Sequence, residues 1–163
     1  MSYISRRLLR SSLLIMVSLV AADNLDCTGI GMDWYITMVG ETPCVTYQNL
    51  RRICDAEFAV GIMSVNTPPD YCADQVADCC CNSVSFGLSM LCLKCVLVSA
   101  FRNGIDARVG AYQTYLNGSS LSHCRNPVFQ GLPTNIQTAV CNEKIKINND
   151  LYSFDAWTNG AWY

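Results

Sequence analysis

Eleven cysteines, all after residue 22 of a 163-residue chain, constrain the fold more than any other feature of the sequence. The first 22 residues have the three parts of a secretory signal: a basic start, an apolar run over Leu13–Val20, and small residues at Ala21 and Ala22. The apolar run is about half as long as the ~20 residues that a membrane-spanning helix needs. We therefore expect residues 1–22 to be removed and the cysteines to form disulfides in an oxidising compartment.

Size and charge narrow the class of the exported chain. Removing Arg6, Arg7 and Arg10 leaves eight basic residues against thirteen acidic ones, a net charge of −5, which disfavours binding to nucleic acid. A hydrophobic fraction of 51% excludes a disordered chain. The length after residue 22 is that of one domain with its own core.

The spacing of apolar residues and cysteines predicts a small, mainly α domain of about three helices. Thr42-Pro43 is a helix start, with threonine as the cap and proline in the first turn. Cys44, Tyr47, Leu50 or Arg51, and Cys54 then share one face at helical spacing. The main helix begins at Asn82 or Ser83 and ends at Asn103-Gly104, and a third is capped by Asp106 and stopped by Asn117-Gly118. Its inner face carries Val109, Tyr112, Gln113 and Leu116.

The remaining segments are expected to hold little regular structure. Residues 23–41 form a lead-in of loop or short strand, and residues 57–65 a short strand or extended loop. Residues 42–124 are the cysteine-rich helical domain, and residues 125–163 a loop-rich tail tethered by Cys141. The apolar run Val84–Phe101 is long enough to span a bilayer, but Lys94 near its centre and its cysteines favour a buried, disulfide-pinned helix.

Cysteine spacing limits the disulfides without determining them. Neighbouring cysteines rarely bond each other, so the triple at 79–81 sends its bonds in different directions. If the first and main helices pack antiparallel, Cys54 falls near the triple and Cys44 near Cys92, which leaves Cys95 for Cys124. Ten cysteines allow about 945 pairings, so these three pairs are hypotheses. The cysteines expected in disulfides are Cys44, Cys54, Cys72, Cys79, Cys80, Cys81, Cys92, Cys95 and Cys124.

An odd number of cysteines leaves one unpaired or bonded to another chain, as in a disulfide-linked dimer. Cys27 and Cys141 are the candidates, because both lie outside the block from Cys44 to Cys124. A zinc site built from the triple and the C-x-x-C motif, or a thioredoxin-like redox motif, is disfavoured by the export signal and by the absence of a βαβ pattern.

Candidate chemistry outside the cysteines is sparse. His123 is the one histidine, and no nucleophile motif or phosphate-binding loop accompanies it, so we expect no enzyme and no resident cofactor or metal. Asp70, Asp74 and Asp78 recur every four residues after Pro68-Pro69. On a second short helix they would form one stripe, either a cation or haem site or an exposed acidic face. Asn117-Gly118-Ser119 is a glycosylation sequon at Asn117.

Residues 42–124 resemble a cysteine-rich extracellular domain that is widespread in basidiomycete fungi. The resemblance implies a secreted or surface-exposed domain and no particular activity. This chain differs from the pattern in its cysteine triple and in Ala73. The residues that carry the resemblance are Thr42-Pro43-Cys44, Leu50, Cys54, Pro68-Pro69-Asp70-Tyr71, Cys79, Cys81-Asn82-Ser83-Val84, Leu88, Cys92-x-x-Cys95, Tyr112, Tyr115 and Cys124.

A second resemblance is to the fungal eight-cysteine CFEM domain, carried by Cys72-x-Asp74, Asp78, Cys79-x-Cys81, Phe86 and Cys92. Members of that family hold haem through an aspartate, which implies Asp74 or Asp78 as the iron ligand here.

Together these observations predict a secreted or cell-surface protein of non-enzymatic type, with an extracellular protein or a cell-wall component as partner. The alternative is a carrier of haem or metal. The uncharged aromatic end, Trp157–Tyr163, would either bind a sugar or partner or fold back on the core. No membrane contact is expected unless the chain is anchored.

Overall fold

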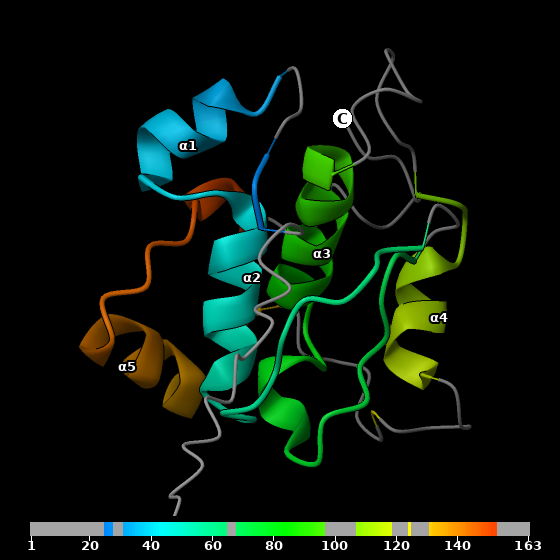
Figure 1. Ribbon diagram of the computed structural model, residues 1–163. Helices are drawn as coiled ribbons and strands as arrows, with labels where there is room; N and C mark the ends of the chain where they lie inside the picture. Colours follow the sequence, from blue (N-terminus) through cyan, green and yellow to red (C-terminus); the bar gives the residue numbers. More distant parts are fainter. Residues whose placement is uncertain are drawn as a thin grey trace, which may run out of the picture.

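The computed structural model describes residues 25–27, 31–64, 68–96, 107–118, 124 and 131–152. Within these residues it is helical and has no strand, which confirms the mainly α, disulfide-stapled class (Figure 1). None of the helices there has the length and apolar character needed to cross a membrane. The elements are α1 (Asp33–Val39), α2 (Pro43–Arg52), the 3-10 helix η1 (Ala77–Cys79), α3 (Ser83–Val96), α4 (Ala111–Asn117), α5 (Thr134–Asn142) and the 3-10 helix η2 (Asn149–Tyr152).

Helices α2 and α3 lie side by side at the centre of the molecule and run antiparallel (Figure 1). Every residue of α3 from Ser83 to Leu93 is buried, so this helix is the axis of the core. Helix α4 packs beside it, and η2 contacts it as well. A helix buried on all sides reads as one apolar run in the sequence, which explains why Val84–Phe101 suggests a membrane span. Residues 97–106 lie outside the described residues. They include the expected end of this helix at Asn103-Gly104 and Asp106, the expected cap of the third helix.

The starts of α2 and α3 follow the capping chemistry that the sequence predicts. The Thr42 hydroxyl oxygen accepts the backbone N–H of Val45 at 3.2 Å, and Pro43 occupies the first helical position. Asn82 caps α3, because its side-chain oxygen accepts the N–H of Ser85 at 2.8 Å. Each such cap stabilises its helix by about 1 kcal/mol.

The lead-in contains a helix, so the expectation of a loop or short strand is wrong there. Helix α1 buries Tyr35 and Val39 in the core, with Met32 just before it. It ends at Gly40, which has φ +90°, a left-handed conformation that favours glycine. The three- and four-residue spacing of Met32, Tyr35 and Val39 was a helical signal in the sequence.

The helix expected after Pro69 does not form. Residues 71–74 have no regular structure, and only the three residues of η1 are helical before Cys80. The backbone N–H of Cys72 donates instead to the carbonyl of Tyr115 in α4 at 3.1 Å. A tertiary partner therefore takes the hydrogen bond that a helix would have used. Residues 57–64 likewise form an irregular loop and no strand.

Helix α4 ends at Asn117, just before Gly118, as predicted, but half of its expected inner face is wrong. Tyr112 and Leu116 are buried, whereas Val109 is 90% exposed and Gln113 is exposed. Val109 precedes the helix, which begins only at Ala111 after Gly110 at φ +83°. The inner face is completed by Tyr115, whose ring lies 5.5 Å from that of Phe86 in α3.

The tail is more ordered than its loop-rich sequence suggests, and a disulfide does not tether it. Residues 131–152 contain α5 and η2, which bury Ile136, Val140 and Leu151. Cys141, the expected tether, is exposed and unpaired. Burial of apolar side chains therefore holds this segment to the core. The aromatic end after Tyr152 lies outside the described residues.

Candidate functional site

The main polar cluster of the interior is centred on Arg51, near the end of α2. Its side chain is only 2% exposed. The Nε and Nη2 groups donate to the two carboxylate oxygens of Asp74, which is itself 5% exposed. This bidentate geometry matches the planar guanidinium to the planar carboxylate. A buried charge of each sign is thereby neutralised by the other.

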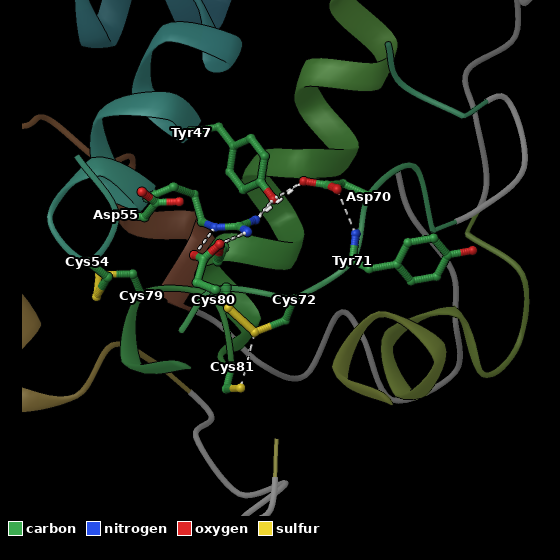
Figure 2. A network of polar contacts seen from close by, with 12 residues as sticks. Tyr47, Cys54, Asp55, Asp70, Tyr71, Cys72, Cys79, Cys80 and Cys81 are labelled. Atoms are coloured by element: carbon green, nitrogen blue, oxygen red, sulfur yellow. Dashed lines mark hydrogen bonds and ion pairs between the residues drawn. A yellow bond between two sulfur atoms is a disulfide. The ribbon is translucent and has the colours of Figure 1, made fainter. Parts of the chain in front are cut away.

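The remaining guanidinium nitrogen connects the pair to the surface. Nη1 donates to the hydroxyl oxygen of Tyr47 and lies 3.3 Å from Oδ2 of Asp70. The Tyr47 hydroxyl donates to the same Asp70 oxygen at 2.7 Å, as Figure 2 shows. The other oxygen of Asp70 accepts the N–H of Tyr71 at 2.8 Å. With 32% of its side chain exposed, Asp70 is the part of the cluster that solvent reaches.

Aromatic rings cover the guanidinium. Its central carbon lies 4.2 Å from the ring centroid of Phe58 and 5.3 Å from that of Tyr47. The two rings meet edge to face, 5.7 Å apart. A cation over an aromatic face is stabilised by about 0.5–2 kcal/mol, more when it is desolvated. The loop that carries Phe58 is thus fastened to the same arginine as the loop that carries Asp74.

The protonation states follow from burial and charge. Burial alone lowers the pKa of Arg51, but Tyr47 and the hydrogen-bonded Asp74 outweigh it and raise that pKa above its ordinary value. Burial raises the pKa of Tyr47 well above 10 and also raises that of Tyr115, whose hydroxyl donates to Ser85 at 3.0 Å. At neutral pH Arg51 is therefore a cation, and the tyrosine hydroxyls are neutral.

The three aspartates do not form one stripe, so the expectation of a shared helical face is wrong. Asp74 points inward to Arg51, and Asp70 lies at the rim of the same cluster. Asp78, in η1, accepts a hydrogen bond from Asn135 of α5 at 2.9 Å. An exposed acidic face is wrong for Asp74. Metal or haem ligation by Asp74 would have to displace Arg51 from both of its oxygens.

Five disulfides join ten of the cysteines. Cys44–Cys92 and Cys54–Cys79 are the two pairs that antiparallel packing predicts. The third pair is wrong, because Cys95 bonds Cys27 and Cys124 bonds Cys81. The remaining bond joins Cys72 to Cys80.

The Cys81–Cys124 and Cys27–Cys95 bonds have a structural reason. The N–H of Cys124 donates to the carbonyl of Leu116, which keeps Cys124 beside the end of α4. Cys72 binds Tyr115 there, so this region faces the cysteine triple and not the far end of α3. At that far end the carbonyl of Leu25 accepts the hydroxyl of Thr42, which brings the lead-in within reach of Cys95.

Three sulfurs crowd together beside η1. The Sγ atoms of Cys72, Cys80 and Cys81 all lie within 4.8 Å of one another, a spacing compatible with metal ligation. Each of them is already in a disulfide, and a metal ligand must be a deprotonated thiol. The oxidised protein therefore offers no thiolate at this place.

The exposed Cys141 leads to the first testable prediction. Alkylation of the denatured, non-reduced protein should label one thiol per chain, at Cys141, or else reveal a reducible dimer linked through it. Cys141→Ser should abolish both the label and the dimer and leave the melting temperature unchanged. Peptide mapping by mass spectrometry makes the assignment. Labelling of Cys27, or three or more labels, would contradict the disulfide framework.

Other predicted residues are only partly placed. Asn117 is exposed on the last turn of α4, whereas His123 and Ser119 of the sequon lie outside the described residues. Arg51 was missed as a polar centre, although its position on the cysteine-bearing face of α2 was a signal of burial. Comparison of the chain with family models, with curated proteins and with solved structures found no match.

Proposed function

We propose that this is a secreted or cell-surface protein that acts by binding, without catalysis, to an extracellular protein or cell-wall component. The observation that carries the proposal is the set of five disulfides, which cross-link α2, α3 and the segments around them. Such a density of disulfides is typical of proteins made for oxidising compartments, because cytosolic reductants keep thiols reduced. The secretory signal at residues 1–22 supports the same compartment.

The polar cluster supports a structural role over a catalytic one. Both oxygens of Asp74 and all three guanidinium nitrogens of Arg51 are engaged with one another or with their neighbours. A catalytic acid or base needs an atom that is free to form a hydrogen bond with the substrate. This cluster instead joins α2 to the loops that carry Phe58 and Asp74.

The second prediction tests export directly. Expressed in a fungal host, the protein should appear in the medium or at the cell surface with Asp23, or a residue within two of it, at its N-terminus. It should carry one glycan on Asn117, so that Asn117→Gln removes the mass shift that a glycosidase removes from the parent. N-terminal sequencing and mass spectrometry of medium, membrane and cytosol provide the measurement. Cytosolic recovery with Met1 intact would contradict the proposal.

The same secreted material separates this proposal from the haem-carrier alternative. Because Asp74 is held by Arg51, we expect no Soret band in the purified protein and none after haemin is added. Asp78 is the aspartate left to bind iron, since its half-buried carboxylate accepts a hydrogen bond from the neutral amide of Asn135 and not from an arginine. A haemin-dependent Soret band that Asp78→Asn abolishes, and that Cys141→Ser leaves intact, would favour the alternative.

A further inference from the structure

Two disulfides near η1 are in direct contact with each other. The Sγ of Cys72, bonded to Cys80, lies 3.2 Å from the Sγ of Cys81, which is bonded to Cys124. We call Cys72, Cys80, Cys81 and Cys124 the exchange cluster. In the described residues, no other group of three cysteine sulfurs, acidic oxygens or histidine nitrogens is as close.

The cluster arises from the backbone after η1. The N–H groups of Cys80 and Cys81 both donate to the carbonyl of Ala77, at 3.1 and 2.7 Å, which holds the two cysteines in one turn. Cys79 bonds Cys54 and takes no part (Figure 2). Cys80 and Cys81 thus both present their sulfurs to Cys72, one as a bond and one as a contact.

We propose that the exchange cluster is a thiol-responsive switch in which Cys72 changes its partner from Cys80 to Cys81. A small external thiolate, such as glutathione, attacks the Sγ of Cys124, forms a mixed disulfide there and releases Cys81 as a thiolate. That thiolate attacks the Sγ of Cys72, forms Cys72–Cys81 and releases Cys80, which takes up a proton. One thiol is consumed, one mixed disulfide and one protein thiol are formed, and no net oxidant is needed.

Burial orders these steps. Cys72 and Cys80 are fully buried, whereas Cys81 is 5% and Cys124 is 8% exposed, so of the two disulfides in the exchange cluster the Cys81–Cys124 bond is the more accessible to a solvent thiol. The switch breaks the covalent bond between Cys124 and Cys81 while Cys72 remains cross-linked. The Cys44–Cys92 and Cys54–Cys79 bonds have no third sulfur within reach among the described residues and should not relay.

The first test removes one member of the cluster. In folded Cys80→Ser, the freed Cys72 thiolate should attack Cys81 and displace Cys124, so alkylation should label Cys72 and Cys124 within about tenfold of one another. The matched control, Cys44→Ser, should label Cys92 and no second buried cysteine. Both variants also label Cys141. Labelling of Cys72 without Cys124 in folded Cys80→Ser would overturn the proposal.

The second test uses the unmodified protein and does not depend on the folding of a variant. Brief treatment with reduced glutathione, followed by acid quench, alkylation and fragmentation mass spectrometry, should place glutathione on Cys124 and the alkyl label on Cys80. A label on Cys81 instead would show that Cys72 does not relay. Equal opening of Cys44–Cys92 at the same glutathione concentration would also overturn the proposal.

Discussion

Asp74→Ala should lower the free energy of unfolding by about 3–5 kcal/mol, because it leaves the Arg51 guanidinium buried without its bidentate partner. The remaining hydrogen bonds, with Tyr47 and Asp70, engage only one of the three nitrogens. Urea unfolding followed by circular dichroism provides the measurement, with the disulfides intact in every sample. The m-value should stay close to that of the parent, since the surface exposed on unfolding is almost unchanged.

Two comparisons isolate the buried charge as the cause. Asp78→Ala is the matched control, because the Asp78 carboxylate is only half-buried and accepts a hydrogen bond from the side-chain amide of the exposed Asn135. Its loss should cost about 1 kcal/mol or less. The double variant Arg51→Met/Asp74→Leu should recover most of the loss, since an apolar pair of similar volume often replaces a buried ion pair without penalty. An Asp74→Ala variant as stable as Asp78→Ala would contradict this account of the cluster.

Each disulfide should contribute to the free energy of unfolding an amount comparable to the loss expected for Asp74→Ala. This contribution should increase with the length of the loop that the disulfide closes. Cys44–Cys92 spans 48 residues of sequence, and chain entropy assigns it about 4 kcal/mol. Cys72–Cys80 spans only 8 residues, for which the same relation gives about 2.5 kcal/mol. Paired Cys→Ala variants measure both by urea unfolding. Since all four cysteines are buried, alanine avoids leaving an unpartnered hydroxyl in the core.

Complete reduction should therefore unfold the protein at 37 °C. Near-UV circular dichroism should be lost in excess reductant, and the melting transition should move below that temperature. Cys141→Ala is the control, because its thiol is exposed and forms no bond within the chain. Unchanged near-UV dichroism and an unchanged melting temperature in excess reductant would mean that the apolar core alone holds the fold.

Features that depend only on neighbouring residues could be predicted from the amino-acid sequence. Thr42-Pro43 and Asn82 start α2 and α3 because capping involves atoms only a few residues apart. Cys44 lies in the first turn of α2 and Cys54 two residues beyond the end of that helix, so the two cysteines lie at opposite ends of α2. This separation was enough to predict their bonds to Cys92 and Cys79 once α2 and α3 were assumed antiparallel. Helix α1 also has a local signal, the helical spacing of Met32, Tyr35 and Val39.

The directions of the aspartate side chains and the pairing of distant cysteines depend on tertiary contacts. Asp74 lies beside Arg51 because residues 71–74 form no helix of their own. The backbone N–H of Cys72 instead donates to the carbonyl of Tyr115 in α4. Cys95 bonds Cys27, 68 residues away, because the lead-in folds back against the start of α2. Cys141 stays unpaired because the other ten cysteines bond one another in five disulfides. Contacts between segments far apart in the chain depend on the packing of the whole core, whereas a sequence pattern records only the preferences of each segment.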